Sequence, residues 1–166
     1  MLKEKILQNL NAAVKEKKDV DVLVLRQLSA AILNKEKEKR FKKSKENPDL
    51  SGTELEKESQ LTDEETLDVV SYEAKKRRES IVGFEAGGRK DLVDKEKKEL
   101  VVLGTYLPEQ LTEEEIKKLV KEAIEKTGAK EIKDMGKVMA ELTPQTKGRA
   151  DGGLVGRIVK ESLLPK

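Results

Sequence analysis

The sequence contains no cysteine, no histidine and no tryptophan, and its only aromatic residues are two tyrosines and two phenylalanines. Without cysteine there can be no disulfide, and without cysteine and histidine there is neither a Ser–His or Cys–His nucleophile nor one of the commonest zinc sites. Any chemistry would have to use carboxylates, lysine, serine, threonine or tyrosine. We therefore expect no catalytic residue, no metal and no cofactor.

Long apolar runs are also missing. No stretch approaches the roughly 20 apolar residues that a membrane-spanning helix needs. The opening residues, Met1 to Glu4, lack the apolar core of a signal peptide, and the acidic Glu4 is unlike a transit peptide. We expect a soluble, cytoplasmic protein with no membrane partner.

Charged residues, by contrast, make up 41% of the 166 residues, although the net charge is only +2. A net charge this small gives no overall attraction to nucleic acid or to an anionic membrane. The charges are unevenly placed, because residues 35–46 are basic and residues 47–68 are acidic. Such blocks either dock a charged partner or form solvated helix faces.

Apolar residues recur every three to four positions along most of the chain, and no segment alternates with a period of two. We therefore predict an all-α protein. Asp19 or Asp21 is expected to cap the second helix, whereas residues 47–60, with Pro48 and Gly52, are predicted to be a mobile acidic loop. The helices are predicted over about 2–17, from 22 into the basic segment, 62–86, 91–104, 112–127, 135–143 and 151–164.

Several short motifs mark where these helices begin and end. Thr62 to Glu65 and Thr112 to Glu115 are capping boxes, Gly87-Gly88 is a typical C-terminal stop, and Pro144 is expected to halt the short helix before it. Tyr106-Leu107-Pro108 has the character of a domain junction. We predict an N-terminal helical-hairpin domain over residues 1–104 and a small C-terminal helical bundle over residues 105–166.

Two charged residues interrupt apolar stripes on either side of Gly87-Gly88. Arg77 falls on the stripe of one helix and Glu96 on that of the next. If the helices form an antiparallel hairpin, the two lie at similar distances from the turn. We predict a structural ion pair between Arg77, or its neighbour Arg78, and Glu96 or Glu99, which would set the register of the hairpin more than its stability. The alternative is that the arginines face an anionic partner.

The stretch from Met135 to Asp151 contains two corners in which glycine precedes a cation, Gly136-Lys137 and Gly148-Arg149. Asp151 is well placed to cap the last helix, which continues with Gly152. A helix N-terminus with glycine and cations beside it is a plausible anion site. The competing interpretation is a helical hairpin whose glycines only allow it to turn. The candidate phosphate-contacting residues are Lys137, Lys147, Arg149 and Arg157, with Gly136, Gly148 and Gly152 as motif glycines.

Other binding motifs are missing from the sequence. It has neither a Walker phosphate loop nor a dinucleotide fingerprint. Glu113 to Glu115 could suggest a magnesium site, but acids in the first turn of a helix are explained by the helix dipole. The four aromatic residues are too scattered to predict a base-stacking surface.

Three segments together resemble the GatB/YqeY family of small stand-alone proteins. They are KRRESIVGFEAGGRKDLVDKEKKEL, TYLPEQLTEEEI and DMGKVMAELTPQTKGRADGGLVGRIVKESL. Within them the resemblance rests on Arg77 and Ser80, Gly88-Arg89 with Asp91-Leu92, Glu96 and Glu99, Tyr106-Leu107-Pro108, Met135 to Met139 and Gly148 to Gly152. It covers nearly the whole chain and is weakest over residues 1–18 and 35–60.

The resemblance implies an all-α protein in two parts, whose C-terminal part is similar to the tail of the B subunit of the tRNA-dependent amidotransferase. That enzyme amidates Glu-tRNA(Gln) or Asp-tRNA(Asn), and its tail helps to hold the tRNA. By resemblance, Gly136-Lys137 and Gly148 to Asp151 match elements of this tail. The chain has no counterpart of the B subunit's cradle domain and lacks the amidase signature of the glutaminase subunit.

Three functional hypotheses follow. The first is a non-catalytic module that binds tRNA or associates with amidotransferase subunits. The second is a protein–protein adaptor that uses the basic and acidic blocks, in which case partner capture would survive RNase. The third is a carbon–nitrogen ligase with glutamine as amido donor, which predicts glutamine-dependent amidation of charged tRNA by the isolated protein.

Overall fold

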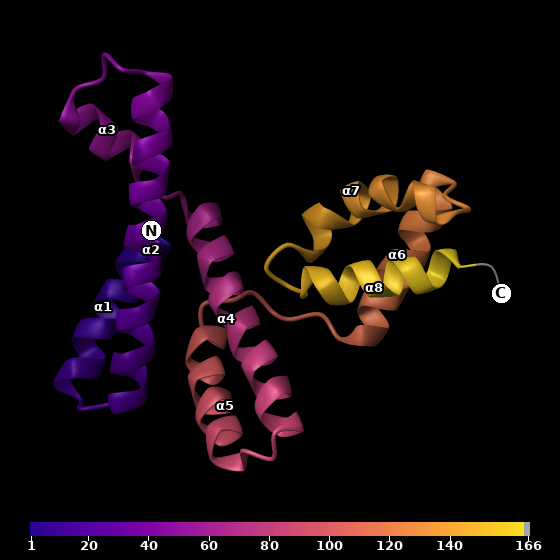
Figure 1. Ribbon diagram of the computed structural model, residues 1–166, viewed down its shortest axis with the longest axis horizontal. Helices are drawn as coiled ribbons and strands as arrows, with labels where there is room; N and C mark the ends of the chain where they lie inside the picture. Colours follow the sequence, from indigo (N-terminus) through magenta and orange to yellow (C-terminus); the bar gives the residue numbers. More distant parts are fainter. Residues whose placement is uncertain (165–166) are drawn as a thin grey trace. The chain divides into compact units, whose positions relative to one another are not determined.

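A computed structural model describes residues 1–164, and all regular elements within them are helices (Figure 1). The prediction of an all-α protein is confirmed. Internal contacts divide the chain into two compact units, Met1–Tyr106 and the remainder from Leu107. Tyr106 lies beyond the boundary predicted at residue 104, but it packs in the first unit: its ring is buried and its hydroxyl accepts a 2.8 Å hydrogen bond from the Asn9 side chain.

The first unit contains two helical hairpins. Helices α1 (Leu2–Lys15) and α2 (Asp19–Glu46) form one, and α4 (Asp63–Ala86) and α5 (Lys90–Gly104) form the other (Figure 1). Each helix buries the apolar side that its three-four spacing creates. The core of this unit includes Ile6, Ala13, Val24, Leu25, Leu28, Ile32, Val70, Ala74, Val93 and Leu103.

The two hairpins turn in the same way. After α1, the Lys18 N–H donates to the Ala13 carbonyl at 3.0 Å and Lys17 adopts a left-handed φ of 56°. After α4, Gly88 occupies the equivalent position with a φ of 66°. This is the Schellman ending, in which a left-handed residue satisfies the last carbonyls of a helix. Gly87-Gly88 therefore ends α4 as predicted.

The acidic segment is not the loop that the sequence predicted for residues 47–60. Gly52–Ser59 form helix α3, which packs beside the end of α2 (Figure 1). Ser51 and Glu54 make an N-terminal capping box, and Glu58 pairs with Lys43 of α2 at 2.9 Å. The loop prediction was wrong because Ser51 to Glu54 already carried a capping motif, and the basic helix supplies the partner.

Two predicted helix boundaries also need correction. Helix α2 begins at Asp19 with Lys18 in the N-cap position, and neither Asp19 nor Asp21 caps it. Pro144 does not stop the helix that contains it, since α7 runs from Met135 to Thr146. A proline in the last turn removes only one backbone bond, and buried Thr146 holds this turn by donating its hydroxyl to the Leu142 carbonyl at 2.9 Å.

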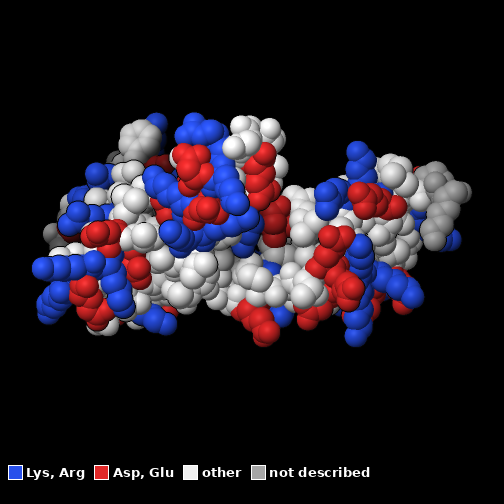
Figure 2. Space-filling view, turned by 90° about the horizontal axis from the view of Figure 1, so that it is seen from below, with Lys and Arg blue, Asp and Glu red and all other residues white. Residues whose placement is uncertain are grey.

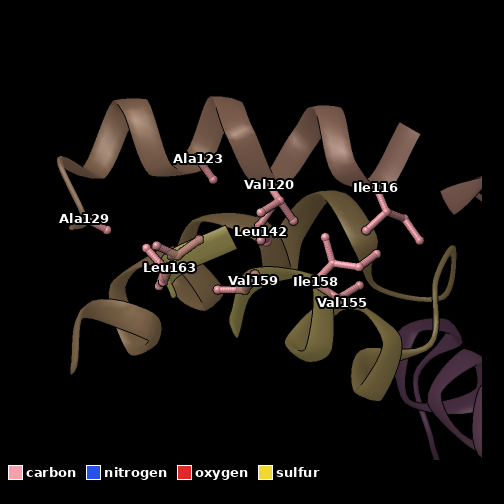
Figure 3. Packing of buried hydrophobic residues seen from close by; sticks show 10 residues of the cluster. Ile116, Val120, Ala123, Ala129, Leu142, Val155, Ile158, Val159 and Leu163 are labelled. Atoms are coloured by element: carbon pink, nitrogen blue, oxygen red, sulfur yellow. The ribbon is translucent and has the colours of Figure 1, made fainter. Parts of the chain in front are cut away.

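The second unit packs α6 (Glu113–Thr127) against α7 and α8 (Gly152–Leu163), with a short 3-10 helix, Ile132–Asp134, before α7. The Thr112 capping box starts α6 as predicted. Figure 3 shows apolar side chains of α6 pointing into a core shared with α7 and α8. This core comprises Ile116, Val120, Ala123, Ala129, Val138, Leu142, Val155, Ile158, Val159 and Leu163.

Arg77 connects three helices of the first unit. Its guanidinium lies 3.0 Å from Glu73 of α4 and 3.2 Å from Glu99 of α5, and it donates to the side-chain oxygen of Gln27 on α2. The partner on α5 is therefore Glu99, the second candidate, and not Glu96. The buried face of α5 is rotated towards Val93 and Glu99, which leaves Glu96 at its edge.

Glu99→Ala should destabilise the first unit by about 3 kcal/mol, because it removes one carboxylate from a buried charge cluster and leaves the arginine undercompensated. Glu96→Ala is the matched control on the same helix, and its cost should stay below about 0.5 kcal/mol. Urea unfolding followed by circular dichroism measures both. Equal losses for the two variants would contradict the assignment of Glu99.

Candidate nucleic-acid interface

The turn between α7 and α8 is built on Gly148. Its φ of 71° is left-handed, a conformation that residues with a side chain adopt at a cost. The segment before α6 fastens this turn, since the Gln110 side chain donates to the Gly148 carbonyl and the Leu111 N–H donates to the Arg149 carbonyl, each at 2.7 Å. Gly148 is thus required by the fold.

Asp151 caps α8, as the sequence predicted. Its carboxylate accepts a 2.9 Å hydrogen bond from the Leu154 N–H. A Cβ added to Gly153 would lie 2.9 Å from the same carboxylate, so glycine at that position leaves room for the cap. The protein's own carboxylate thus takes the place that an anion would occupy at this helix N-terminus. The anion site expected there is already filled.

Arg149 is partly committed to the fold. Its Nε donates to the Glu109 carbonyl at 3.2 Å, and the residue is half-buried. This contact ties the α7–α8 turn to the segment that precedes α6. Sequence reasoning missed it, since no local pattern indicates a carbonyl forty positions away.

Lys137 and Arg157 are both largely exposed and weakly paired. Lys137 is 72% exposed and lies 3.5 Å from Asp134, and Arg157 is 62% exposed and lies 3.9 Å from Glu161. Both are exposed ion pairs within one helical turn, which contribute little and exchange readily for other partners. Asp134 could have been found from its i, i+3 spacing.

The four cations are spread over the α7–α8 hairpin. Arg149 and Arg157 both act on the first turn of α6, since Arg149 helps to lower the pKa of Glu115 and Arg157 that of Glu113. Lys137 lies in the first turn of α7. Lys147, which is exposed, and Arg149 follow the other end of α7. Ten residues, or about 15 Å along α7, separate Lys137 from Lys147. A single phosphate ion cannot contact both, so binding by all four cations would need an extended polyanion such as a nucleic acid.

The two other motif glycines differ from Gly148. Within residues 1–164, and apart from its chain neighbours and own helix backbone, an added Cβ at Gly136 or at Gly152 would meet no atom within 4 Å, and neither residue has a positive φ. No contact or backbone strain in this described part of the chain therefore requires glycine at these positions. Gly136 therefore leaves bare backbone at the N-terminal end of α7, whereas the N-terminal end of α8, next to Gly152, is already occupied by the Asp151 carboxylate.

Acidic side chains surround these cations. Figure 2 shows basic and acidic residues interspersed over the face that it presents. Hydrogen bonding to Lys117 lowers the pKa of Glu113, and Arg157 adds to the effect from α8. The cations thus lie in a field of mixed sign, which disfavours tight non-specific binding and favours contacts of defined geometry.

Four of the residues that carried the resemblance in the first unit gather at one place. Arg77, Ser80, Glu96 and Glu99 line an open groove of about 600 Å³ between α2, α4 and α5. Within residues 1–164 there is no group of three or more acidic side chains arranged to hold a metal ion. No helix of this described region has both the length and the apolar character to cross a bilayer.

A family model described as "Yqey-like protein" matches the chain over residues 3–163. The chain belongs to this family. The match extends through both units of this YqeY-like protein, including the first helix and the charged residues 35–60, where the resemblance of motifs was weakest. A search of curated proteins gave no significant match.

The capping box of α6 provides a pH test of how the second unit is held together. Hydrogen bonds from the Thr112 backbone N–H and hydroxyl lower the pKa of Glu115, and Arg149 contributes. A carboxylate with a depressed pKa stabilises the fold above its unfolded pKa of about 4.3, and this contribution disappears as pH falls through the folded value.

Glu115→Gln should therefore lower the stability of the protein at pH 7 and have a smaller effect at pH 3, where the wild-type carboxyl is protonated too. Thermal unfolding of both proteins across this range measures the difference. Glu114→Gln is the control, because Glu114 lies in the same turn but is not the capping-box residue. A deficit that does not depend on pH would contradict the role given to the carboxylate.

Proposed function

We propose that this YqeY-like protein is a non-catalytic tRNA-binding module that contacts the phosphates of the RNA with the α7–α8 hairpin. The observation that carries the proposal is that the exposed cations Lys137 and Arg157 hold only weak ion pairs, and that Gly136, directly before Lys137, leaves bare backbone at the start of α7. Family membership supports it, through the similarity of this unit to the amidotransferase tail.

The contacts of the individual cations give the proposal a definite form. Lys137 and Arg157 would bind phosphate directly, because each would exchange a weak exposed ion pair for a stronger charge-assisted bond. Arg149 would have a double role, holding the turn through Glu109 and adding positive charge beside it. Association with amidotransferase subunits is the natural extension, since such a module would present tRNA to an enzyme that modifies it.

The adaptor hypothesis has less support from the contacts. The basic and acidic blocks that would dock a partner pair with each other, through Lys39 with Glu65 at 2.7 Å and Lys43 with Glu58 at 2.9 Å. Much of their charge is therefore compensated within the chain. A protein partner would have to displace these pairs or use other surfaces.

Binding of tRNA, measured by fluorescence anisotropy over a series of KCl concentrations, tests the proposal. Affinity should fall steeply with salt, and Lys137→Ala/Arg157→Ala should weaken binding by about tenfold and reduce the slope of log K against log salt by roughly one unit for each lost phosphate contact. A protein that does not bind tRNA at low salt would refute the proposal.

The matched control is Lys118→Ala/Lys121→Ala. It removes the same charge from exposed positions of α6 in the same unit. If the two double variants lose affinity and slope equally, the α7–α8 hairpin has no special part in binding and net charge alone explains the result.

Gly136→Ala separates a functional glycine from one that only shapes the chain. Alanine is the better helix former, and its Cβ would have open space around it among the described residues, so the variant should be more stable by about 0.5 to 1 kcal/mol. Its tRNA affinity should fall several-fold if the RNA backbone approaches the bare helix end. Unchanged affinity would remove Gly136 from the interface.

Gly148→Ala provides the contrast, because its φ of 71° predicts a loss of stability of about 1 kcal/mol. Thermal unfolding and anisotropy on both variants measure the two properties separately. The proposal requires that stability and affinity change in opposite directions in Gly136→Ala.

A further inference from the structure

The basic block of α2 has an inward and an outward face. Lys39, Arg40 and Lys43 face inward, where they contact Glu65, the Gly52 carbonyl and Glu58 respectively. Lys37, Phe41 and Lys45 follow one another at intervals of four residues and therefore lie on one side of the helix. Folding of the acidic segment onto α2 thus compensates one face of the block and leaves the other uncovered.

Phe41 is the centre of this outward face. Its side chain is 62% exposed, and Lys45 Nζ lies 4.4 Å from the centroid of its ring. Glu38, one turn before Phe41, is paired with Lys35 at 2.9 Å. The exposed aromatic ring thus has the Lys45 ammonium group over it and Lys37 one turn before it on the same side of the helix.

We propose that this face, defined by Lys37, Phe41 and Lys45, binds single-stranded RNA. An unpaired base would stack on the ring of Phe41, and the lysines would contact the phosphates on either side. Base stacking on an exposed aromatic combined with cations along the backbone is the general means of binding single strands without reading their sequence. From Lys37 to Lys45 the face spans about 12 Å, enough for a short run of nucleotides.

The surroundings of Phe41 favour RNA over a protein partner. Protein interfaces surround a buried aromatic with further contacts that exclude water. Residues 37–45 contain no apolar residue besides Phe41, so the ring has no apolar neighbour along its own helix. A flat base can use the face of the ring alone, and Lys45 would either move aside or leave the opposite face to the base.

This site lies in the first unit and uses none of the residues assigned to tRNA on the α7–α8 hairpin. It shares with the proposed function only the class of ligand. An exposed loop or an unpaired end of an RNA could bind to this site, whereas double-stranded RNA could not, because its bases are already stacked.

The test uses the full chain and a short unstructured RNA that contains 2-aminopurine, whose fluorescence is quenched on stacking. We expect wild-type protein to bind and to change the fluorescence. Phe41→Leu should lose the change and bind about tenfold more weakly, whereas Phe41→Trp should retain both. A 2-aminopurine signal that is the same in wild type and Phe41→Leu overturns the proposal.

Tyr72→Leu is the matched control. Tyr72 is also 62% exposed and also has a lysine over its ring, with Lys76 Nζ 5.3 Å from the centroid, but the residue one turn before it is Asp68. Its substitution should leave the signal intact. An equal loss in this variant, or no binding of the oligonucleotide at low salt, overturns the proposal.

The two proposals fail separately. At saturating RNA the 2-aminopurine change should persist in Lys137→Ala/Arg157→Ala, because stacking depends on Phe41. If that double variant alone weakens tRNA binding and Phe41→Leu has no effect on the stacking signal, the hairpin interface stands and the α2 site is refuted. The reverse pattern would establish the α2 site and refute the hairpin interface.

Discussion

The arrangement of helices in the first unit depends on the contacts of the buried Arg77 guanidinium. This guanidinium joins α2, α4 and α5 through Gln27, Glu73 and Glu99. A charge in this position costs desolvation, which only several partners at short distance can offset. The hairpin of α4 and α5 is therefore held in one register relative to α2. The same network forms the wall of a groove, so the residues that stabilise the helices also shape the surface between them.

A second constraint is the compensation of charge within a chain that is 41% charged. Lysines of α2 pair with the acids of α3 and of the first turn of α4, and each pair by itself contributes little. Together these pairs hold α3 and the start of α4 against α2. What remains uncompensated after folding, the outward side of α2 around Phe41, is accordingly more informative than the basic block as a whole.

In the second unit, the fold requires glycine at some positions and not at others. Gly148 is needed for a left-handed turn, and Gly153 makes room for the Asp151 cap. Gly136 and Gly152 satisfy no such need. Gly136 lies at the start of α7, directly before the weakly paired Lys137, and this position supports the proposal of an RNA interface.

The sequence by itself determined the helices and most of their ends, because apolar periodicity and capping boxes are local properties. It indicated all-α structure, the caps at Thr62, Thr112 and Asp151, and the stop at Gly87-Gly88. It missed α3, although Ser51 and Glu54 carried a capping box, since the low apolar content of that segment suggested a loop. In that segment the prediction followed the composition and not the capping motif.

Only the tertiary structure decided which charges meet. The sequence predicted that Arg77 and the acids of α5 lie near each other, but it could not determine which acid pairs with the arginine. Packing sets the rotation of α5 about its axis, and this rotation brings Glu99 rather than Glu96 to Arg77. Likewise, local pattern identified Lys137, Lys147, Arg149 and Arg157 as one group of cations. The fold separated them by role, because a contact such as Arg149 with the Glu109 carbonyl depends on where distant segments come to lie.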